Sequence, residues 1–231
     1  MSRRTVISHV IFDCDGVLVD SEMLSAGVLM GMMAEIDLPI TDEIFRADFL
    51  GRSFANAAVR AEVRFGRPMP EDFQLRYRDR LLTRMREALQ PMPGVFGVLD
   101  AMAVPCWLAT SSSPQRLAVS LEVTGLAPHF KGRCSTASEV ARGKPEPDLF
   151  LYAAGKLAAA PEQCLVLEDS EMGLTAARAA GMTVWHFVGG SHIRSDDVLP
   201  EKATPDRVIA NMAELHSAFA ELGLCQATAH G

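Results

Sequence analysis

Residues 6–22 of the chain read VISHVIFDCDGVLVDSE. Apolar, β-branched and aromatic residues fill Val6–Phe12 almost without interruption, which is typical of a central strand of a parallel sheet that is buried on both faces. The predicted strand runs directly into the segment Asp13–Gly16, which contains two aspartates. We therefore expect two carboxylates at the end of a buried strand, followed by a glycine that lets the backbone turn.

The sequence pattern changes after this segment and indicates two domains. From residue 21 to residue 90 apolar residues recur at helical spacing, first at Leu24, Val28, Met32 and Ile36. The segment PMPG at 91–94 favours a turn, and after it the predicted strands and helices alternate. The first strand thus precedes the helical block, and its partners follow it. We predict an α/β fold with a Rossmann-like parallel sheet core (residues 1–19 and 91–231) and an inserted all-α helical domain (residues 20–90).

Polar side chains follow the later predicted strands as well. A strand at 106–110 leads into Thr110, Ser111 and Ser112, and a strand at 164–167 ends in Glu168 and Asp169. Lys144 follows the loop at 136–143 and is one of few lysines in the chain. Ligands of open parallel sheets bind beyond the carboxyl ends of the strands. We therefore expect carboxylates, hydroxyls and one ammonium group to gather at one edge of the sheet.

Carboxylates that lie this close together repel one another unless a cation or a shared proton compensates them. Hard oxygen ligands select Mg²⁺, which holds one or two carboxylates and completes its shell with water and phosphate oxygens. The sequence therefore predicts a magnesium site at Asp13, Asp15 and the Glu168–Asp169 pair.

Composition excludes several classes of protein. The 231 residues are 48% hydrophobic and 22% charged, which is ordinary for a globular chain with a sizeable core. A net charge of -7 without basic tracts argues against nucleic-acid binding. The five scattered cysteines form no CxxC pair, so we expect free thiols rather than a zinc site or disulfides. We find no signal peptide and no apolar run long enough to span a bilayer, and we expect a cytoplasmic protein that does not bind membranes.

Four segments together resemble the motifs of the haloacid dehalogenase superfamily, in order along the chain. They are FDCDGVLVDSE (12–22), LATSSSP (108–114), GKPEPDLF (143–150) and LEDSEMGLTAARAAGM (167–182). The finer resemblance is to its β-phosphoglucomutase-like, sugar-phosphate phosphatase branch, in which a helical cap is inserted after the first strand. The resemblance covers nearly the whole chain and implies phosphoryl transfer with Mg²⁺ as cofactor.

The resemblance implies three catalytic residues. Asp13 would be the nucleophile that takes the phosphoryl group as an aspartyl phosphate. Asp15 would protonate the leaving alkoxide and then accept a proton from the attacking water. Lys144 would neutralise charge between Asp13 and the phosphoryl group.

The resemblance also implies how phosphate and metal are held. Thr110 and the backbone N–H of Ser111 would bind phosphate oxygens. Asp169 would bind Mg²⁺ together with Asp13 and the backbone carbonyl of Asp15. Glu168 would either bind the metal itself or contact a residue that binds it, and the sequence leaves both roles open. Arg52, in the expected substrate loop of the cap, would contact a carboxylate or hydroxyl of the substrate, although an exposed surface arginine fits its pattern equally.

Two related activities and one signalling role compete with the phosphatase. β-Phosphoglucomutases carry a histidine in the first cap helix and a lysine before the cap-loop glycine; Ser25 and Leu50 stand at these positions here, which weakens the mutase alternative. Dehalogenases of the superfamily lack the second aspartate of the first motif and use no metal. Receiver domains combine similar groups, but they are shorter and have no inserted helical domain.

We therefore expect a phosphatase that hydrolyses a small phosphorylated metabolite, with a sugar phosphate or a phosphorylated sugar acid favoured as substrate. The sequence does not name that substrate. It leaves the oligomeric state open, with a monomer slightly favoured.

Overall fold

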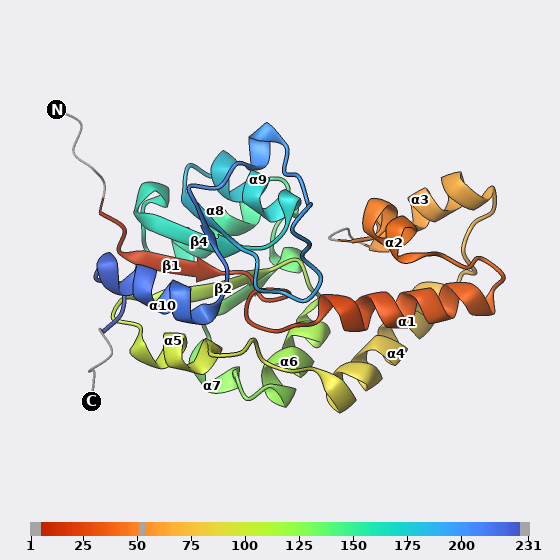
Figure 1. The fold of residues 1–231 in the computed structure, drawn as a ribbon, viewed down its shortest axis with the longest axis horizontal. Helices are drawn as coiled ribbons and strands as arrows, with labels where there is room; N and C mark the ends of the chain where they lie inside the picture. Colours follow the sequence, from red (N-terminus) through yellow and green to blue (C-terminus); the bar gives the residue numbers. More distant parts are fainter. Residues whose placement is uncertain (1–5, 51–53, 227–231) are drawn as a thin grey trace. The chain divides into compact units, whose positions relative to one another are not determined.

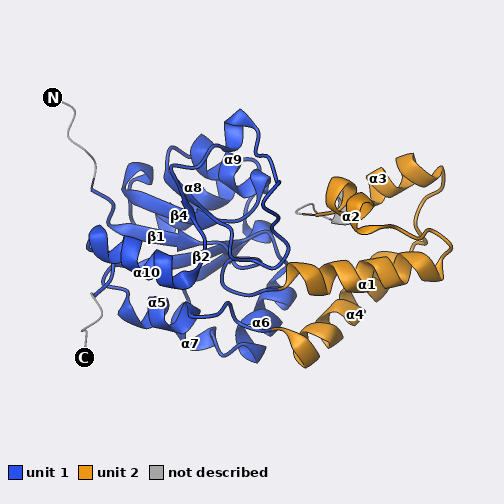
Figure 2. Ribbon diagram, in the orientation of Figure 1, with its two compact units in different colours: residues 1–20, 90–231 blue, residues 21–89 orange. Residues whose placement is uncertain are grey.

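The computed structural model describes residues 6–50 and 54–226. The chain divides into two compact units (Figure 2): the sheet unit, made of residues 1–20 and 90–231, and the helical insertion, residues 21–89. Both borders lie one residue from those expected from the sequence, at 19/20 and 90/91.

The sheet unit is built around a parallel sheet (Figure 1). Within the described residues the sheet has six strands in the order β3-β2-β1-β4-β5-β6. The strands are β1 (His9–Phe12), β2 (Cys106–Thr110), β3 (Cys134–Thr136), β4 (Cys164–Glu168), β5 (Thr183–Phe187) and β6 (Arg207–Ile209). The predicted α/β class with a parallel sheet core is confirmed.

Helices cover both faces of this sheet (Figure 1). They are α5 (Val95–Ala101), α6 (Pro114–Val123), α7 (Ala127–Phe130), α8 (Asp148–Lys156), α9 (Glu171–Ala179) and α10 (Met212–Glu221). The first strand is buried on both faces, as its composition predicts. Ile11 packs into the core cluster formed with α8 and α9, whereas the ring of Phe12 contacts Phe130 of α7 and Phe219 of α10.

The helical insertion has its own apolar core. Its helices are α1 (Glu22–Glu35), α2 (Asp42–Asp48), α3 (Phe54–Phe65) and α4 (Phe73–Ala88). The stripe expected on the first helix is confirmed in part: Met32 is fully buried, and Val28 and Ile36 are partly buried and pack against the same core, whereas Leu24 is only partly buried. The buried positions of α1 include Ala26, Leu29 and Met33. Since α1 is apolar on almost every side, its spacing alone does not identify the face that packs.

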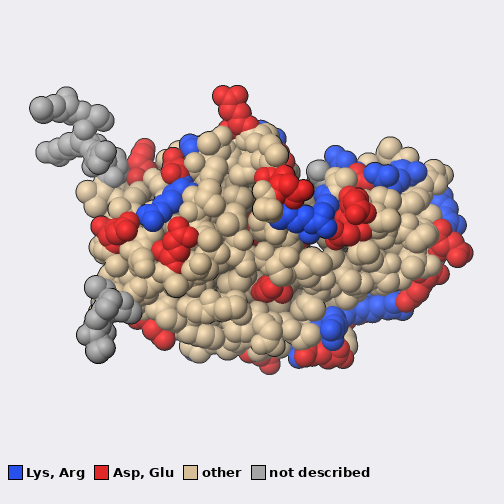
Figure 3. Space-filling model, viewed as in Figure 1, with Lys and Arg blue, Asp and Glu red and all other residues tan. Residues whose placement is uncertain are grey.

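Arginines of the insertion pair with nearby acids rather than forming one basic patch. Arg80 of α4 contacts Glu35 of α1 at 2.5 Å, and Arg84 contacts Glu87 at 3.3 Å. On the face drawn in Figure 3, Lys and Arg lie among Asp and Glu over the insertion. Exposed pairs of this kind contribute little stability, typically about 0–1 kcal/mol.

The chain leaves the sheet unit at residues 18–20 and returns to it at residues 90–92, and we call these two adjacent segments the two passages. The N–H of Asp20 donates to the carbonyl of Gln90 at 3.2 Å, and the N–H of Met92 donates to that of Leu18 at 2.8 Å. An antiparallel bridge pairs Val19 with Pro91 between them. The two passages therefore form a short ribbon at the base of the insertion.

Several short elements were not expected from the sequence. α5, α7 and β3 span seven, four and three residues, which is too short for hydrophobic periodicity to reveal. The first strand begins at His9 rather than at Val6. All five cysteines are free, and four of them are buried. In the described part of the chain, no helix has the length and apolar character needed to cross a membrane.

Candidate active site

The register of the two central strands brings the acidic residues together. Phe12 of β1 lies beside Leu167 of β4, and the N–H of Asp13 donates to the carbonyl of Leu167 at 2.9 Å. The residues that follow this pair, Asp13 on one strand and Glu168 on the other, must therefore emerge next to each other at the carboxyl edge of the sheet.

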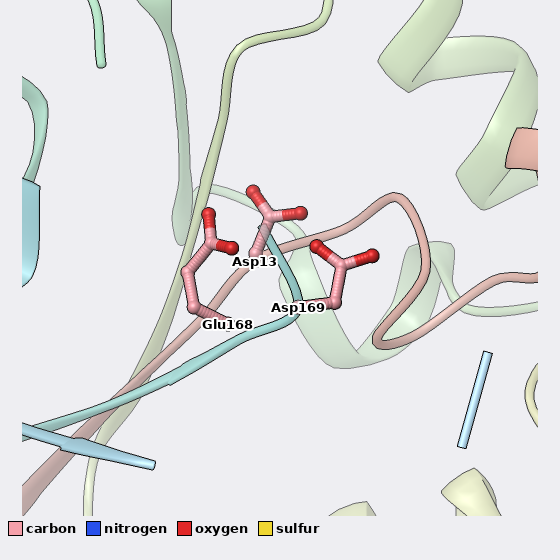
Figure 4. Close-up of side chains that lie close together, drawn as sticks. All are labelled: Asp13, Glu168 and Asp169. Carbon is pink, nitrogen blue, oxygen red and sulfur yellow. The ribbon is translucent and has the colours of Figure 1, made fainter. Parts of the chain in front are cut away.

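Three carboxylates gather at this edge (Figure 4). Asp13, Glu168 and Asp169 are all buried, and one oxygen of each lies within 4.8 Å of one oxygen of each of the others. With metal–oxygen bonds of ~2.1 Å, carboxylates at this spacing can share one Mg²⁺ ion.

Lys144 lies between two of these carboxylates. Its Nζ is 2.5 Å from Oδ1 of Asp13 and 2.6 Å from Oε1 of Glu168, and it also donates to the carbonyl of Ala109 at 3.3 Å. The ring of Phe150 lies 4.8 Å below the ammonium. Lys144 comes from the long loop after β3, eight residues beyond the end of that strand, so the loop rather than a strand end delivers this group.

Burial and charge act in opposite directions on the pKa values in this cluster. Burial lowers the pKa of Lys144, but the carboxylates of Asp13 and Glu168 outweigh it and raise that pKa, so Lys144 stays charged. Burial raises the pKa of Asp13 well above its usual value, although Lys144 opposes the rise. Glu168 is buried too, yet Lys144 and the hydrogen bonds from Ser170 hold its pKa below the usual value.

Glu168 is fixed by the start of α9. Its Oε2 accepts hydrogen bonds from the N–H and the hydroxyl of Ser170, at 2.7 and 3.0 Å, while Oε1 receives Lys144. The absence of a side chain at Gly173 makes room for this carboxylate, because a Cβ there would lie 1.7 Å from Oε1. Both oxygens of Glu168 therefore already have protein donors.

Asp15 is held by residues from the end of β2 and the first turn of α6. Its Oδ2 accepts from the hydroxyls of Ser112 at 2.6 Å and Thr110 at 3.4 Å, and its Oδ1 accepts from Arg116 at 2.7 Å. The N–H of Ser112 donates to the hydroxyl of Thr110 at 3.0 Å. Thr110 thus lies beside Asp15, whereas the side chain of Ser111 is exposed.

Asp169 is surrounded by groups from three segments. His192 Nε2 donates to its Oδ2 at 3.1 Å, and His186 of β5 donates to its backbone carbonyl at 3.1 Å. Gly16 has a φ of +79°, and a Cβ there would lie 1.7 Å from Oδ2 of Asp169. A glycine at this turn is therefore required both by the backbone and by the carboxylate.

The sequence places Ser112 at this edge but does not predict its contact with Asp15, and it does not identify Arg116, His186 or His192. The sequence contains a signal for the last of these, because the loop with His192 follows the apolar segment MTVWHFV at 182–188, whose composition favours a strand. Arg116 had no such signal, since its contact depends on how the first turn of α6 faces Asp15. Arg52 lies outside the described residues.

The donor set fits a hard divalent cation. All three clustered side chains offer carboxylate oxygens, the ligands that Mg²⁺ and Ca²⁺ prefer. Three carboxylates face the single ammonium of Lys144, which leaves an excess of two negative charges among these four groups when all are ionised. A buried excess of this size favours the binding of a compensating cation.

Comparison with known proteins identifies the family. The family model of haloacid dehalogenase-like hydrolases matches residues 7–181. The 6-phosphogluconate phosphatase of Escherichia coli K12 is 24% identical over 94% of this chain and 97% of its own length. The phosphorylated carbohydrates phosphatase of Thermotoga maritima is 30% identical over 75% of this chain and 81% of its own length.

A solved structure agrees with this assignment. The haloacid dehalogenase family hydrolase of Deinococcus radiodurans, solved with bound phosphate and sodium, is 31% identical with a TM-score of 0.76, over 96% of this chain and 99% of that one. The resemblance carried by the four sequence motifs is thereby confirmed. The chain belongs to the haloacid dehalogenase-like hydrolases, as a phosphatase of that family that acts on phosphorylated metabolites.

Proposed function

We propose that the protein hydrolyses a small phosphorylated sugar or sugar acid, with Mg²⁺ as cofactor and an aspartyl phosphate on Asp13 as intermediate. The observation that carries the proposal is the buried carboxylate of Asp13 within 2.5 Å of Lys144 and in the same cluster as Asp169. An anionic nucleophile that attacks an anionic phosphate needs positive charge beside it, which Lys144 supplies and which a cation held by Asp13 and Asp169 would add.

The metal would be held by Asp13, Asp169 and the backbone carbonyl of Asp15. When bound, Mg²⁺ would offset the negative charge of the nucleophile and of the phosphoryl oxygens. The contacts of Glu168 favour an indirect role over direct ligation of the metal, because its oxygens already bind Lys144 and Ser170. In this proposal Glu168 holds Lys144 in place beside Asp13.

The chemistry takes two half-reactions. An oxygen of Asp13 attacks phosphorus, the bond from phosphorus to the substrate oxygen breaks, and Asp15, which must enter this step protonated, gives its proton to the leaving alkoxide. Asp15 then takes a proton from water, whose oxygen attacks phosphorus, so that phosphate leaves and the carboxylate of Asp13 is restored. Ser112 and Arg116 orient Asp15 for both transfers, while Thr110 and the N–H of Ser111 bind phosphate oxygens.

The helical insertion is the proposed cap. A lid that closes over the site would exclude bulk water and choose the substrate, with hinges near residues 19–20 and 90–94. Arg52 remains a predicted substrate contact of this cap. The activities of the Escherichia coli and Thermotoga relatives on 6-phosphogluconate and on phosphorylated carbohydrates support the substrate class.

One contact supports the phosphatase over the mutase alternative. The hydroxyl of Ser25, at the position of the mutase histidine, donates to the carbonyl of Ser21 at 3.1 Å, within its own helix. Adding a bisphosphate primer to sugar 1-phosphates separates the two activities, because only a mutase depends on it.

Metal removal tests the proposal directly. We expect the protein to release phosphate from para-nitrophenyl phosphate in the presence of Mg²⁺, to lose this activity with EDTA and to recover it when excess Mg²⁺ is added. Phosphate release from a panel of about a hundred phosphorylated metabolites then identifies the substrate. Activity that is indifferent to chelation would contradict the metal role.

Asp15→Asn tests the acid–base step. We expect kcat to fall by ~10²–10⁴-fold, the usual contribution of general acid–base catalysis, while KM changes by less than about threefold. Steady-state kinetics on the best substrate of the panel measure both constants. The matched control is Asp100→Asn, which removes an exposed carboxylate on α5. A change in KM alone would exclude the acid–base role of Asp15.

A further inference from the structure

The loop that follows β5 joins two functional parts of the sheet unit. The N–H and the hydroxyl of Ser191 both donate to Oδ1 of Asp20, at 3.2 and 2.8 Å. Asp20 is the last residue of the sheet unit before the insertion begins. The next residue of the loop, His192, is buried and donates from Nε2 to Oδ2 of Asp169 at 3.1 Å. A continuous path of contacts thus runs from the base of the insertion to the carboxylate cluster.

The carboxylate of Asp169 has little freedom to rotate. Its Oδ2 lies against Gly16 so closely that a Cβ at residue 16 would overlap it. His192 binds this same oxygen from the loop, and His186 holds the backbone carbonyl of Asp169. A hydrogen bond to one oxygen fixes the plane of a carboxylate, and therefore also the direction of its other oxygen, Oδ1.

We propose that His192 is a positioning residue for Asp169: it holds the carboxylate in the orientation that binds the divalent cation, and the Ser191–Asp20 hydrogen bonds anchor it. This inference rests on the proposed metal role of Asp169. Groups that hydrogen-bond a metal-binding carboxylate control how well the site is formed before the ion arrives, and their loss typically costs about 10–100-fold in metal affinity.

The identity of the side chain at position 192 gives the proposal a graded test. Glutamine can place an amide N–H near the position of Nε2 of histidine, whereas leucine fills similar space without a donor. We therefore expect His192→Leu to raise the Kd for Mg²⁺ by about 10–100-fold and His192→Gln to keep it within about threefold of wild type. Ser191→Ala removes one of the two hydrogen bonds to Asp20, and we expect a rise in Kd of about two- to fivefold.

Isothermal titration of the full chain with MgCl₂, without substrate, measures these constants. The matched control is His216→Leu on α10, which we expect to bind Mg²⁺ as wild type does. Kinetics supply a second readout: at saturating Mg²⁺ the His192 variants should regain most of the wild-type kcat with an unchanged KM for substrate, which a general loss of structure would not allow.

The outcomes separate this inference from the proposed function. A wild-type protein that binds no Mg²⁺ would overturn the metal role itself and this inference with it. A wild-type protein that binds Mg²⁺ while His192→Leu binds it equally well would overturn the positioning role of His192 and leave the proposed function intact. If His192→Leu does not fold, the Ser191→Ala variant tests the inference instead. A Kd for Mg²⁺ equal to that of wild type would then contradict the role of the Ser191–Asp20 hydrogen bonds in holding His192.

Discussion

Asp13→Asn is expected to reduce phosphate release to below about 0.1% of the wild-type rate. The amide of asparagine carries no charge and is a poor nucleophile, so the bond to phosphorus cannot form at a useful rate. The change preserves the shape of the side chain and leaves Lys144 its contact with Glu168 at 2.6 Å. Phosphate release on the best substrate, measured over hours with a sensitive assay, gives the residual rate.

The fold should survive this substitution. Burial raises the pKa of Asp13, because moving the ionised carboxylate out of water costs free energy in the folded state. A neutral amide avoids this desolvation cost. We therefore expect the thermal midpoint in EDTA to be unchanged or higher than that of wild type. Turnover above ~1% of the wild-type rate in a folded variant would remove Asp13 from the nucleophile role.

Lys144→Met should damage both activity and stability. Removing one partner of a buried ion pair leaves an uncompensated charge, which typically costs about 3–5 kcal/mol. Here two buried carboxylates, Asp13 and Glu168, lose the ammonium that lies between them. We also expect kcat to fall by at least ~10²-fold, because the nucleophile loses a preorganised positive charge.

Urea unfolding in EDTA isolates the effect on stability, since no bound metal can then replace the lost charge. The matched control is Lys156→Met on α8, where an exposed ammonium lies over the ring of Tyr152 and contacts no carboxylate cluster. We expect the control to stay within about 0.5 kcal/mol of wild type. A Lys144→Met protein that is as stable and as active as wild type would refute the bridging role of this lysine.

The sequence could predict the parts of the site that depend on strand ends. Asp13 and Glu168 follow buried strands, and the carboxyl ends of parallel strands lie at one edge of the sheet, so their placement at the same edge requires no knowledge of side-chain packing. That β1 and β4 are neighbours comes from the structure. Thr110 ends its strand in the same way. These residues are placed by topology, which hydrophobic patterning specifies well.

Residues that reach the site from loops or helix turns could not be placed in this way. Lys144 was recognised from its motif, but β3 is too short to show periodicity and the path of the following loop depends on tertiary packing. The partners of Asp15 and Asp169, such as Arg116 and His192, are set by the rotation of α6 and the course of the loop after β5. Contacts of this kind depend on side-chain rotamers and on the local backbone conformation. The periodicity of apolar residues in the sequence carries no information on either.

The two-stranded ribbon at the base of the insertion affects how easily the inserted segment can change in length or sequence. Its two passages are hydrogen-bonded to each other at Asp20 and Gln90, so the ends of the inserted segment lie next to each other. Closing a loop between adjacent ends costs an entropy that grows only slowly with length. The segment between these two ends can therefore be lengthened, shortened or exchanged at a small entropic cost, and if it is the cap proposed above, selectivity can change while the residues of the sheet edge stay as they are.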